Sequence, residues 1–194
     1  MADTGLREKT RNNKNRKILQ EIIFKYLEEF QGDSERAKNI REHVLQYADY
    51  LNIERYFERA LAVVGKLKQL DRDGYDFSDR SDAKTVTLSL TKASRKKDDS
   101  GFYTCISGLI GNVHKKVGAL RIVAYNQEYD CLDYFYIPKK EIAGLVGNLR
   151  DKKIRIRFRK SKGDYNIEKF RVSSFEELAK KRSKSSKSSK RFKA

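Results

Sequence analysis

The sequence has few of the residues that build covalent or metal cross-links. Its 194 residues include two cysteines and two histidines. Cys105 and Cys131 lie in apolar, strand-like runs, and neither histidine stands at a spacing from them that is typical of a zinc site. We therefore expect buried, reduced thiols rather than a disulfide or a zinc centre, as is usual in the cytoplasm.

Long apolar runs are also missing. No stretch of the sequence is long and apolar enough to span a bilayer. Residues 1–17 are polar and basic, without the apolar segment of a secretory signal. We therefore expect no membrane partner and a cytoplasmic location. The only proline, Pro138, follows an apolar run and predicts the end of a strand, because proline donates no hydrogen bond to a β-ladder.

Positive charge is what the sequence has in excess. The formal net charge is +17, and charged residues make up 37% of the chain. This balance favours a polyanionic partner, with nucleic acid ahead of an anionic membrane surface. Hydrophobic residues make up 38% and recur periodically, so the chain can build a core and is not disordered as a whole. The length suits one domain with appendages.

Helical periodicity dominates the first part of the chain. Apolar spacing and capping residues predict three helices, at 15–30, from about 33 to 50 and at 53–70. We expect the third helix to pack against the sheet that follows. Residues 1–14 and 180–194 are polar and basic, and we expect a disordered leader and a disordered tail.

The rest of the chain is rich in predicted strands. Alternation and turn residues predict them at 83–92, 102–106, 119–125, 131–137, 154–159 and 167–172. A short helix or turn is expected at 139–149, and Ser174 and Glu177 form a capping box for a final helix. The sequence therefore predicts a single α+β or α/β domain over 15–179, in which helices flank a mixed central sheet. Its parts are a helical segment (15–52), a core (53–142) and basic strands with the last helix (143–179).

Three carboxylates, those of Asp76, Asp79 and Asp82, fall just before the strand at 83–92. Residues two apart in a strand point to the same face, so Asp82 and Lys84 should project side by side. One interpretation is a solvated turn followed by the last exposed lysine. The other is a metal site for phosphodiester hydrolysis, in which carboxylates hold a divalent cation beside a lysine.

The predicted strand at 154–159 has a basic face. Its apolar residues alternate with Arg155, Arg157 and Arg159. Such a face either keeps a sheet surface soluble or contacts the phosphates of a nucleic acid. The aromatic residues at 134–136 alternate between faces, which favours core packing over a platform for stacking bases.

The order of helix, acidic hairpin and Asp-x-Lys strand resembles the PD-(D/E)XK nuclease superfamily, the restriction-endonuclease-like enzymes. The resemblance covers about 53–142. Asp82-Ala83-Lys84 matches the second half of the signature. The first acid is Asp76 or Asp79, and Asp76 is preferred because six residues leave room for a tight turn. Glu58 matches a glutamate that many members add from the preceding helix, although an exposed helix glutamate is at least as good an interpretation.

This resemblance implies a fold, a cofactor and an activity. The fold would be restriction-endonuclease-like, and the activity would be Mg²⁺-dependent (or Mn²⁺-dependent) hydrolysis of DNA, of the restriction type. The metal ligands would be the Asp82 carboxylate, the Ala83 carbonyl and one further carboxylate, that of Asp76 or Asp79. Lys84 would orient the attacking water or support the developing negative charge.

The candidate phosphate contacts are Lys115, Lys116, Arg121, Arg155, Arg157 and Arg159. RNA in place of DNA, and a homodimer, are left open. The competing hypothesis is a non-catalytic DNA- or RNA-binding protein that uses the basic strand and tail. Its binding would be sensitive to salt and indifferent to Mg²⁺.

Overall fold

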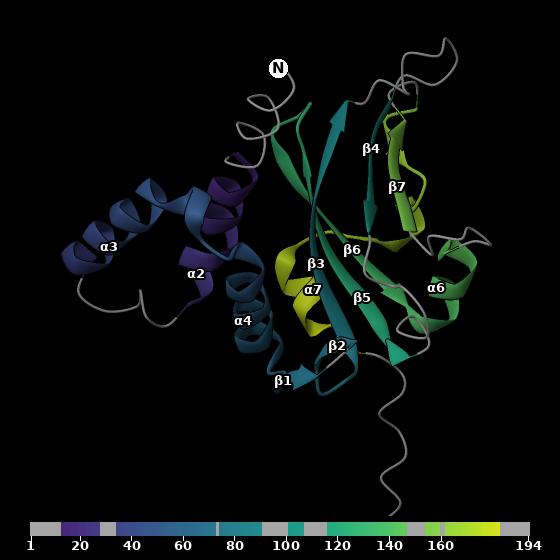
Figure 1. Ribbon diagram of the computed structural model, residues 1–194, viewed down its shortest axis with the longest axis horizontal. Coiled ribbons are helices and arrows are strands. Elements are labelled where there is room, and N and C mark those ends of the chain that lie inside the picture. Colours follow the sequence, from purple (N-terminus) through teal and green to yellow (C-terminus); the bar gives the residue numbers. More distant parts are fainter. Residues whose placement is uncertain are drawn as a thin grey trace, which may run out of the picture.

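A mixed β-sheet forms the centre of the protein, and helices cover both of its faces (Figure 1). The computed structural model describes residues 13–27, 34–72, 74–90, 101–106, 116–146, 154–159 and 162–182. Within these ranges the large sheet has seven strands in the order β8-β7-β4-β3-β5-β6-β9. Strands β3 and β5 are parallel, and every other neighbouring pair is antiparallel. The predicted mixed sheet flanked by helices is confirmed.

The strands of this sheet are β3 (Ser81–Leu90), β4 (Gly101–Ile106), β5 (Ala119–Asn126), β6 (Cys131–Pro138), β7 (Ile154–Arg159), β8 (Asp164–Tyr165) and β9 (Arg171–Val172). A separate antiparallel pair, β1 (Gln69–Arg72) and β2 (Tyr75–Phe77), leads into β3. Among the described residues, β4 pairs with β3 only at Ser89 and Leu90. Strand β2 lies beside β3 as well, and it brings the acidic hairpin to that strand.

The helical segments frame the sheet. Residues 13–18 are helical and continue through a π-helical turn, η1 (Leu19–Ile23), into α2 (Phe24–Tyr26). The others are α3 (Ser34–Gln46), η3 (Ala48–Tyr50), α4 (Ile53–Gly65), α6 (Lys139–Val146), η5 (Glu168–Phe170) and α7 (Phe175–Lys180). None of the helices in the described ranges has the length and apolar character needed to cross a membrane.

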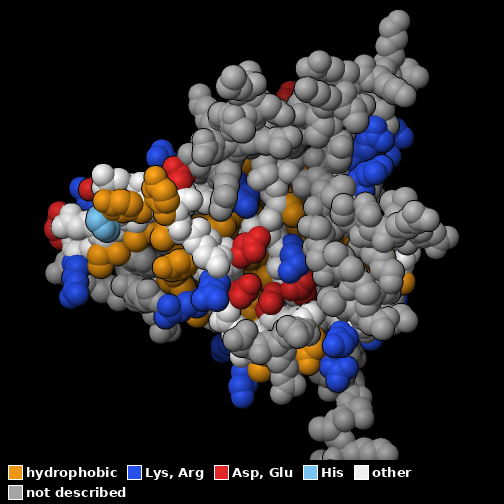
Figure 2. Space-filling model, viewed as in Figure 1, with side chains coloured by type: hydrophobic (Ala, Val, Ile, Leu, Met, Phe, Trp, Pro, Cys, Tyr) orange, Lys and Arg blue, Asp and Glu red, His pale blue; other side chains and the backbone are white. Residues whose placement is uncertain are grey.

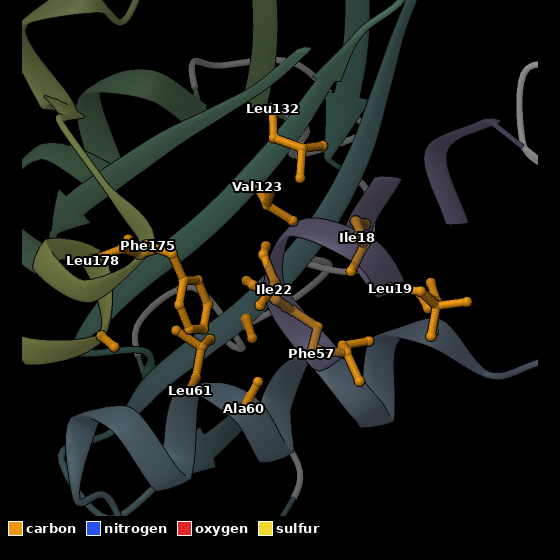
Figure 3. Close-up of a cluster of buried hydrophobic side chains, with 14 of the residues drawn as sticks. Ile18, Leu19, Ile22, Phe57, Ala60, Leu61, Val123, Leu132, Phe175 and Leu178 are labelled. Atoms are coloured by element: carbon orange, nitrogen blue, oxygen red, sulfur yellow. The ribbon is translucent and has the colours of Figure 1, made fainter. Parts of the chain in front are cut away.

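Side-chain alternation on β5 divides the core into two clusters. Val123 faces a cluster that α4, α7 and the N-terminal helix complete, and Figure 3 shows Phe57, Leu61 and Phe175 converging there. Ile122 points to the opposite face, into the cluster that α6 covers. Because successive strand residues point to opposite faces, α4 and α7 lie on one side of the sheet and α6 on the other. The predicted packing of the third helix against the sheet is therefore confirmed.

Several predicted boundaries were wrong, and tertiary contacts explain one of them well. The helix predicted at 53–70 ends at Gly65, because Lys66 adopts a left-handed conformation (φ 49°). A Cβ on Gly65 would lie 2.4 Å from the carbonyl oxygen of Ala179, so α7 packs closely against the end of α4. The chain then turns into β1 instead of continuing as a helix.

The other differences are at the N-terminus and near 167–172. The first helix is already formed at residue 13 and ends at Tyr26, rather than running from 15 to 30. The second predicted helix ends at Gln46, and a 3₁₀ turn follows it. The strand predicted at 167–172 is mostly the 3₁₀ turn η5, with only β9 extended. Most of the predicted leader and tail, residues 1–12 and 183–194, lies outside the described residues.

The predictions succeed where the alternation is strong. Strands β5, β6 and β7 fall where the sequence placed them, and β6 ends at Pro138. The apolar residues of β7 are buried, while Arg155 is exposed and the other two arginines are half-buried. Ser174 caps α7, since its hydroxyl accepts a hydrogen bond from the Glu177 N–H at 3.1 Å.

Candidate active site

The turn between β2 and β3 is held by Asp79. Its Oδ1 accepts hydrogen bonds from the Ser81 backbone N–H at 3.0 Å and from the Ser81 hydroxyl at 2.5 Å. A short acidic side chain that bonds a backbone N–H two residues ahead stabilises a tight turn. Arg80, between them, takes a left-handed conformation with φ 62°. The conformation of this turn brings β2 alongside the start of β3.

Asp76 reaches β3 from this hairpin. Its Oδ2 accepts a hydrogen bond of 2.7 Å from the backbone N–H of Ala83. The N–H and C=O groups of one residue in an extended strand point to the same side. The Ala83 carbonyl is therefore directed toward the edge of β3 where the Asp76 carboxylate lies.

Asp82 and Lys84 lie side by side on β3, as their spacing predicts. The Lys84 Nζ atom is 3.0 Å from each carboxylate oxygen of Asp82. Along the same face of the strand, Leu88 is buried in the cluster under α6, and Val86 packs against it. Asp82 is only 5% exposed, so this ion pair stands at the border between the core and the site.

Burial and the neighbouring charges shift the pKa values of Asp82 and Lys84. Burial, reinforced by the neighbouring Asp76 carboxylate, raises the pKa of Asp82 to about 7, although the Lys84 ammonium opposes that shift. Burial lowers the pKa of Lys84, but the carboxylates of Asp82 and Asp76 outweigh it and the pKa is raised overall. Lys84 is therefore a positive charge at neutral pH, and Asp82 is poised between its two protonation states.

Glu58 joins the site from α4. Its Oε2 accepts a 3.0 Å hydrogen bond from the side-chain amide of Gln69, on β1. Burial raises the pKa of Glu58 to about 7, with a further increase from the Asp76 charge and a decrease from Lys84. The same pair of charges thus acts on Glu58 and on Asp82. Figure 2 shows acidic side chains gathered around a basic one at the junction of α4 and β3.

Asp79 and Arg121 form a buried ion pair away from these groups. The Arg121 Nη2 lies 2.9 Å from the Asp79 Oδ2, and its Nε donates to the Ser81 hydroxyl at 2.9 Å. The guanidinium also donates to backbone carbonyls at the end of α7, including those of Leu178 and Ala179, and lies over the ring of Tyr136. Burial alone would raise the pKa of Asp79, but the hydrogen bonds from Ser81 and the charge of Arg121 hold that pKa below its ordinary value.

These contacts revise two of the candidate assignments. Both carboxylate oxygens of Asp79 are engaged, Oδ1 by Ser81 and Oδ2 by Arg121 on β5, so Asp76 is the acid that faces Asp82. Arg121 is fully buried, with 0% of its surface exposed, so it is not placed where a phosphate could reach it. Sequence spacing could not reveal this, because its partners lie in the β2–β3 turn and in α7.

The remaining candidate phosphate contacts are dispersed. Lys116 is exposed just before β5, and Lys115 lies outside the described residues. Arg155, Arg157 and Arg159 share one face of β7, where Arg159 also pairs with Asp164 through a 2.7 Å bond from Nε to Oδ1. None of these arginines belongs to the cluster around Asp82.

The donor set suits a hard divalent cation. Asp76, Asp82 and the Ala83 carbonyl supply only oxygen atoms, which Mg²⁺ and Mn²⁺ prefer. Mg²⁺ commonly uses one or two protein carboxylates and completes its shell with water and substrate phosphate. No group of three or more His, Cys, Asp or Glu residues in the described ranges is placed to hold a metal ion. The fit therefore rests on two carboxylates and a carbonyl.

Three further residues adjoin the site, and the sequence had not indicated them. Glu54 lies one helical turn before Glu58 and accepts a 3.4 Å hydrogen bond from the Thr85 hydroxyl. That hydroxyl also accepts from Lys14 at 3.3 Å. The spacing of Glu54 and Glu58 by four residues could have suggested a shared helix face, but no signal in the sequence links Lys14 to Thr85.

Comparisons with protein-family models, with curated proteins and with solved structures found no match to this chain.

Proposed function

We propose that this protein is a Mg²⁺-dependent (or Mn²⁺-dependent) endonuclease that hydrolyses phosphodiester bonds in DNA, of the restriction-endonuclease type. The observation that supports the proposal most is the meeting of Asp76, Asp82 and Lys84 at one edge of β3, beside Glu58. A buried carboxylate that pairs with a half-buried lysine and faces two further carboxylates is a costly arrangement, and such groups are common at functional sites.

The proposed roles follow from charge and position. Asp76, Asp82 and the Ala83 carbonyl would hold the metal ion. Bound Mg²⁺ supplies Lewis acidity, which lowers the pKa of a water ligand and neutralises charge on the phosphate. Lys84 is held beside Asp82 with a raised pKa, so it offers a fixed positive charge to the transition state. Glu58, with a pKa of about 7, can accept or release a proton near neutral pH.

The net charge of +17 supports a nucleic-acid substrate. Lys116 and the arginine face of β7 are candidates to neutralise phosphates beyond the scissile one. DNA is the proposed partner, and repeating the cleavage assay below with RNA tests the alternative substrate.

The test is a cleavage assay on supercoiled plasmid and on a large, varied genomic DNA, with Mg²⁺, Mn²⁺ or EDTA. Asp82→Asn and Lys84→Ala should each lower the metal-dependent rate about 10²-fold or more, because each removes a charge that acts on the transition state. The matched control is Lys25→Ala, which breaks an exposed pair with Glu176 (3.0 Å) away from the site. It should cut DNA at the wild-type rate.

Two results would contradict the proposal. DNA that is bound but never cut, equally by all the variants, would support the non-catalytic nucleic-acid-binding protein. Cleavage that survives both site substitutions would place the activity elsewhere in the chain.

A further inference from the structure

Three segments of the chain meet at Gly118, where β3 and β5 begin and β6 ends. The Gly118 N–H donates to the Arg80 carbonyl at 2.6 Å, and the Lys139 N–H donates to the Gly118 carbonyl at 3.0 Å. Beyond this point the three segments pair as neighbouring strands, which lie about 5 Å apart. The residues that flank Gly118 in the three segments are therefore close together.

Each of the three segments carries an exposed cation here. Arg80, Lys116 and Lys139 all have exposed side chains, and we call these three residues the junction patch. Within the described part of the chain, none of the three side chains forms an ion pair. Lys140, the next residue in α6, has a side chain that is 81% exposed and only a long contact of 3.9 Å with Glu141.

The acidic side chains beside the junction patch are paired with other cations. These ion pairs are Asp79–Arg121 at 2.9 Å, Asp82–Lys84 at 3.0 Å and Glu141–Lys169 at 2.8 Å. Positive charges that are held close together without acidic partners repel one another. The junction patch therefore favours an anion that can contact several cations at once.

The junction patch adjoins the candidate active site. Arg80 precedes Asp82 by two residues, which span at most about 7 Å of chain. One strand of duplex DNA carries a phosphate about every 3.4 Å of helix axis. A DNA strand with one phosphate beside Asp82 and Lys84 would therefore bring the next phosphates to Arg80 and its neighbours.

The surroundings of the junction patch favour DNA over an anionic membrane. Proteins that lie on a membrane surface commonly combine basic side chains with apolar ones that enter the lipid. The large hydrophobic side chains exposed in the described ranges lie elsewhere, at η3, in α4 and in the β5–β6 turn, and they are Tyr47, Tyr50, Val63 and Tyr129. Lys and Arg side chains alone are what a phosphodiester backbone requires.

We propose that the junction patch binds the phosphate backbone of duplex DNA and holds the strand across the start of β3. The binding is independent of base sequence, because phosphates carry no sequence information. The place of this contact beside the scissile phosphate rests on the proposed function; the binding itself does not.

The test measures the affinity for a short fluorescent DNA duplex by anisotropy in EDTA, at salt concentrations between about 50 and 200 mM. Each phosphate contact contributes about 0.9 to the slope of log affinity against log salt concentration. Arg80→Ala/Lys116→Ala/Lys139→Ala should therefore reduce the magnitude of this slope by about 2–3. It should also weaken binding at the lowest salt concentration at least about tenfold.

The matched control removes the same three charges from another part of the protein. Lys25→Ala/Lys38→Ala/Arg41→Ala changes exposed residues of α2 and α3, which lie away from the junction patch (Figure 1). Because salt screens distant charges, this variant should bind within about threefold of the wild type. The charge-preserving variant Arg80→Lys/Lys116→Arg/Lys139→Arg should also bind like the wild type.

Circular dichroism checks that each variant folds. If the alanine triple variant does not fold, Lys116→Ala/Lys139→Ala takes its place, with an expected reduction of the slope by about 1–2. The inference would be overturned by a patch variant that binds DNA like the wild type, or by an equal loss in the control. Binding to phosphatidylserine vesicles that depends on the patch, with DNA binding unchanged, would also overturn it.

The EDTA in the binding assay separates this inference from the proposed function. A protein that never cuts DNA, yet binds it through the junction patch, would contradict only the nuclease. A protein that cuts DNA, and binds it equally well without the junction patch, would contradict only this inference.

Discussion

The buried guanidinium of Arg121 should be one of the most important single side chains for stability. Arg121→Met keeps the approximate length of the side chain but removes its charge and all its donors. The Asp79 carboxylate would lose its 2.9 Å partner, the Ser81 hydroxyl would lose a bond, and the carbonyls of Leu178 and Ala179 at the end of α7 would each lose a donor. Removing one partner of a buried pair costs about 3–5 kcal/mol. At about 2–4 °C per kcal/mol, the Tm should fall by about 6–20 °C.

Urea unfolding at pH 7, followed by far-ultraviolet circular dichroism, measures this loss. The control is Lys25→Met, which breaks the exposed pair with Glu176 and should cost less than about 1 kcal/mol. The double variant Asp79→Asn/Arg121→Met should lose less than the sum of the single variants, because it leaves no uncompensated buried charge.

A loss below about 1 kcal/mol for Arg121→Met, accompanied by weaker DNA binding, would refute the structural role. It would then return Arg121 to the phosphate contacts that the sequence suggested. The structural assignment instead requires that folding suffers while the salt dependence of DNA binding stays the same.

Two further predictions concern the metal and the packing of α7. Folded-state pKa values of about 7 for Asp82 and Glu58 are above their unfolded values, so protons favour the folded state and the metal-free protein loses stability as pH rises from about 4 to 7. Mg²⁺ binds the ionised carboxylates, so it should raise the Tm more at pH 8 than at pH 5.5; an equal shift at both pH values in calorimetry would contradict this. Gly65→Ala should destabilise the protein by about 1–3 kcal/mol in urea, because the new Cβ would lie 2.4 Å from the Ala179 carbonyl. Gly144→Ala, where a Cβ meets nothing within 4 Å on α6, should instead be neutral or stabilise by up to about 1 kcal/mol, and equal effects would refute the close contact.

The parts of the fold that could be predicted are those where a local pattern agrees with the tertiary environment. Strand β7 alternates apolar and basic residues because one face is buried and the other is not. Pro138 ends β6 through the chemistry of its own backbone. Lys66 is the opposite case. Its left-handed conformation ends α4, yet a lysine carries no sign of it. The residue before it, Gly65, lies against Ala179 of α7, more than a hundred residues later, and no local pattern reveals that contact.

The candidate site divides in the same way. Strand periodicity was enough to place Asp82 beside Lys84, since the two residues share one element. It could not choose between Asp76 and Asp79, because both precede the strand and either carboxylate can fit a turn. The choice is made by Arg121, which lies 42 residues beyond Asp79 and binds it in the core. Asp79 is committed to the turn, and the Asp76 carboxylate instead lies at the edge of β3, where it accepts a hydrogen bond from the Ala83 N–H. Long-range pairing of one acid is thus what leaves the other available for the chemistry proposed here.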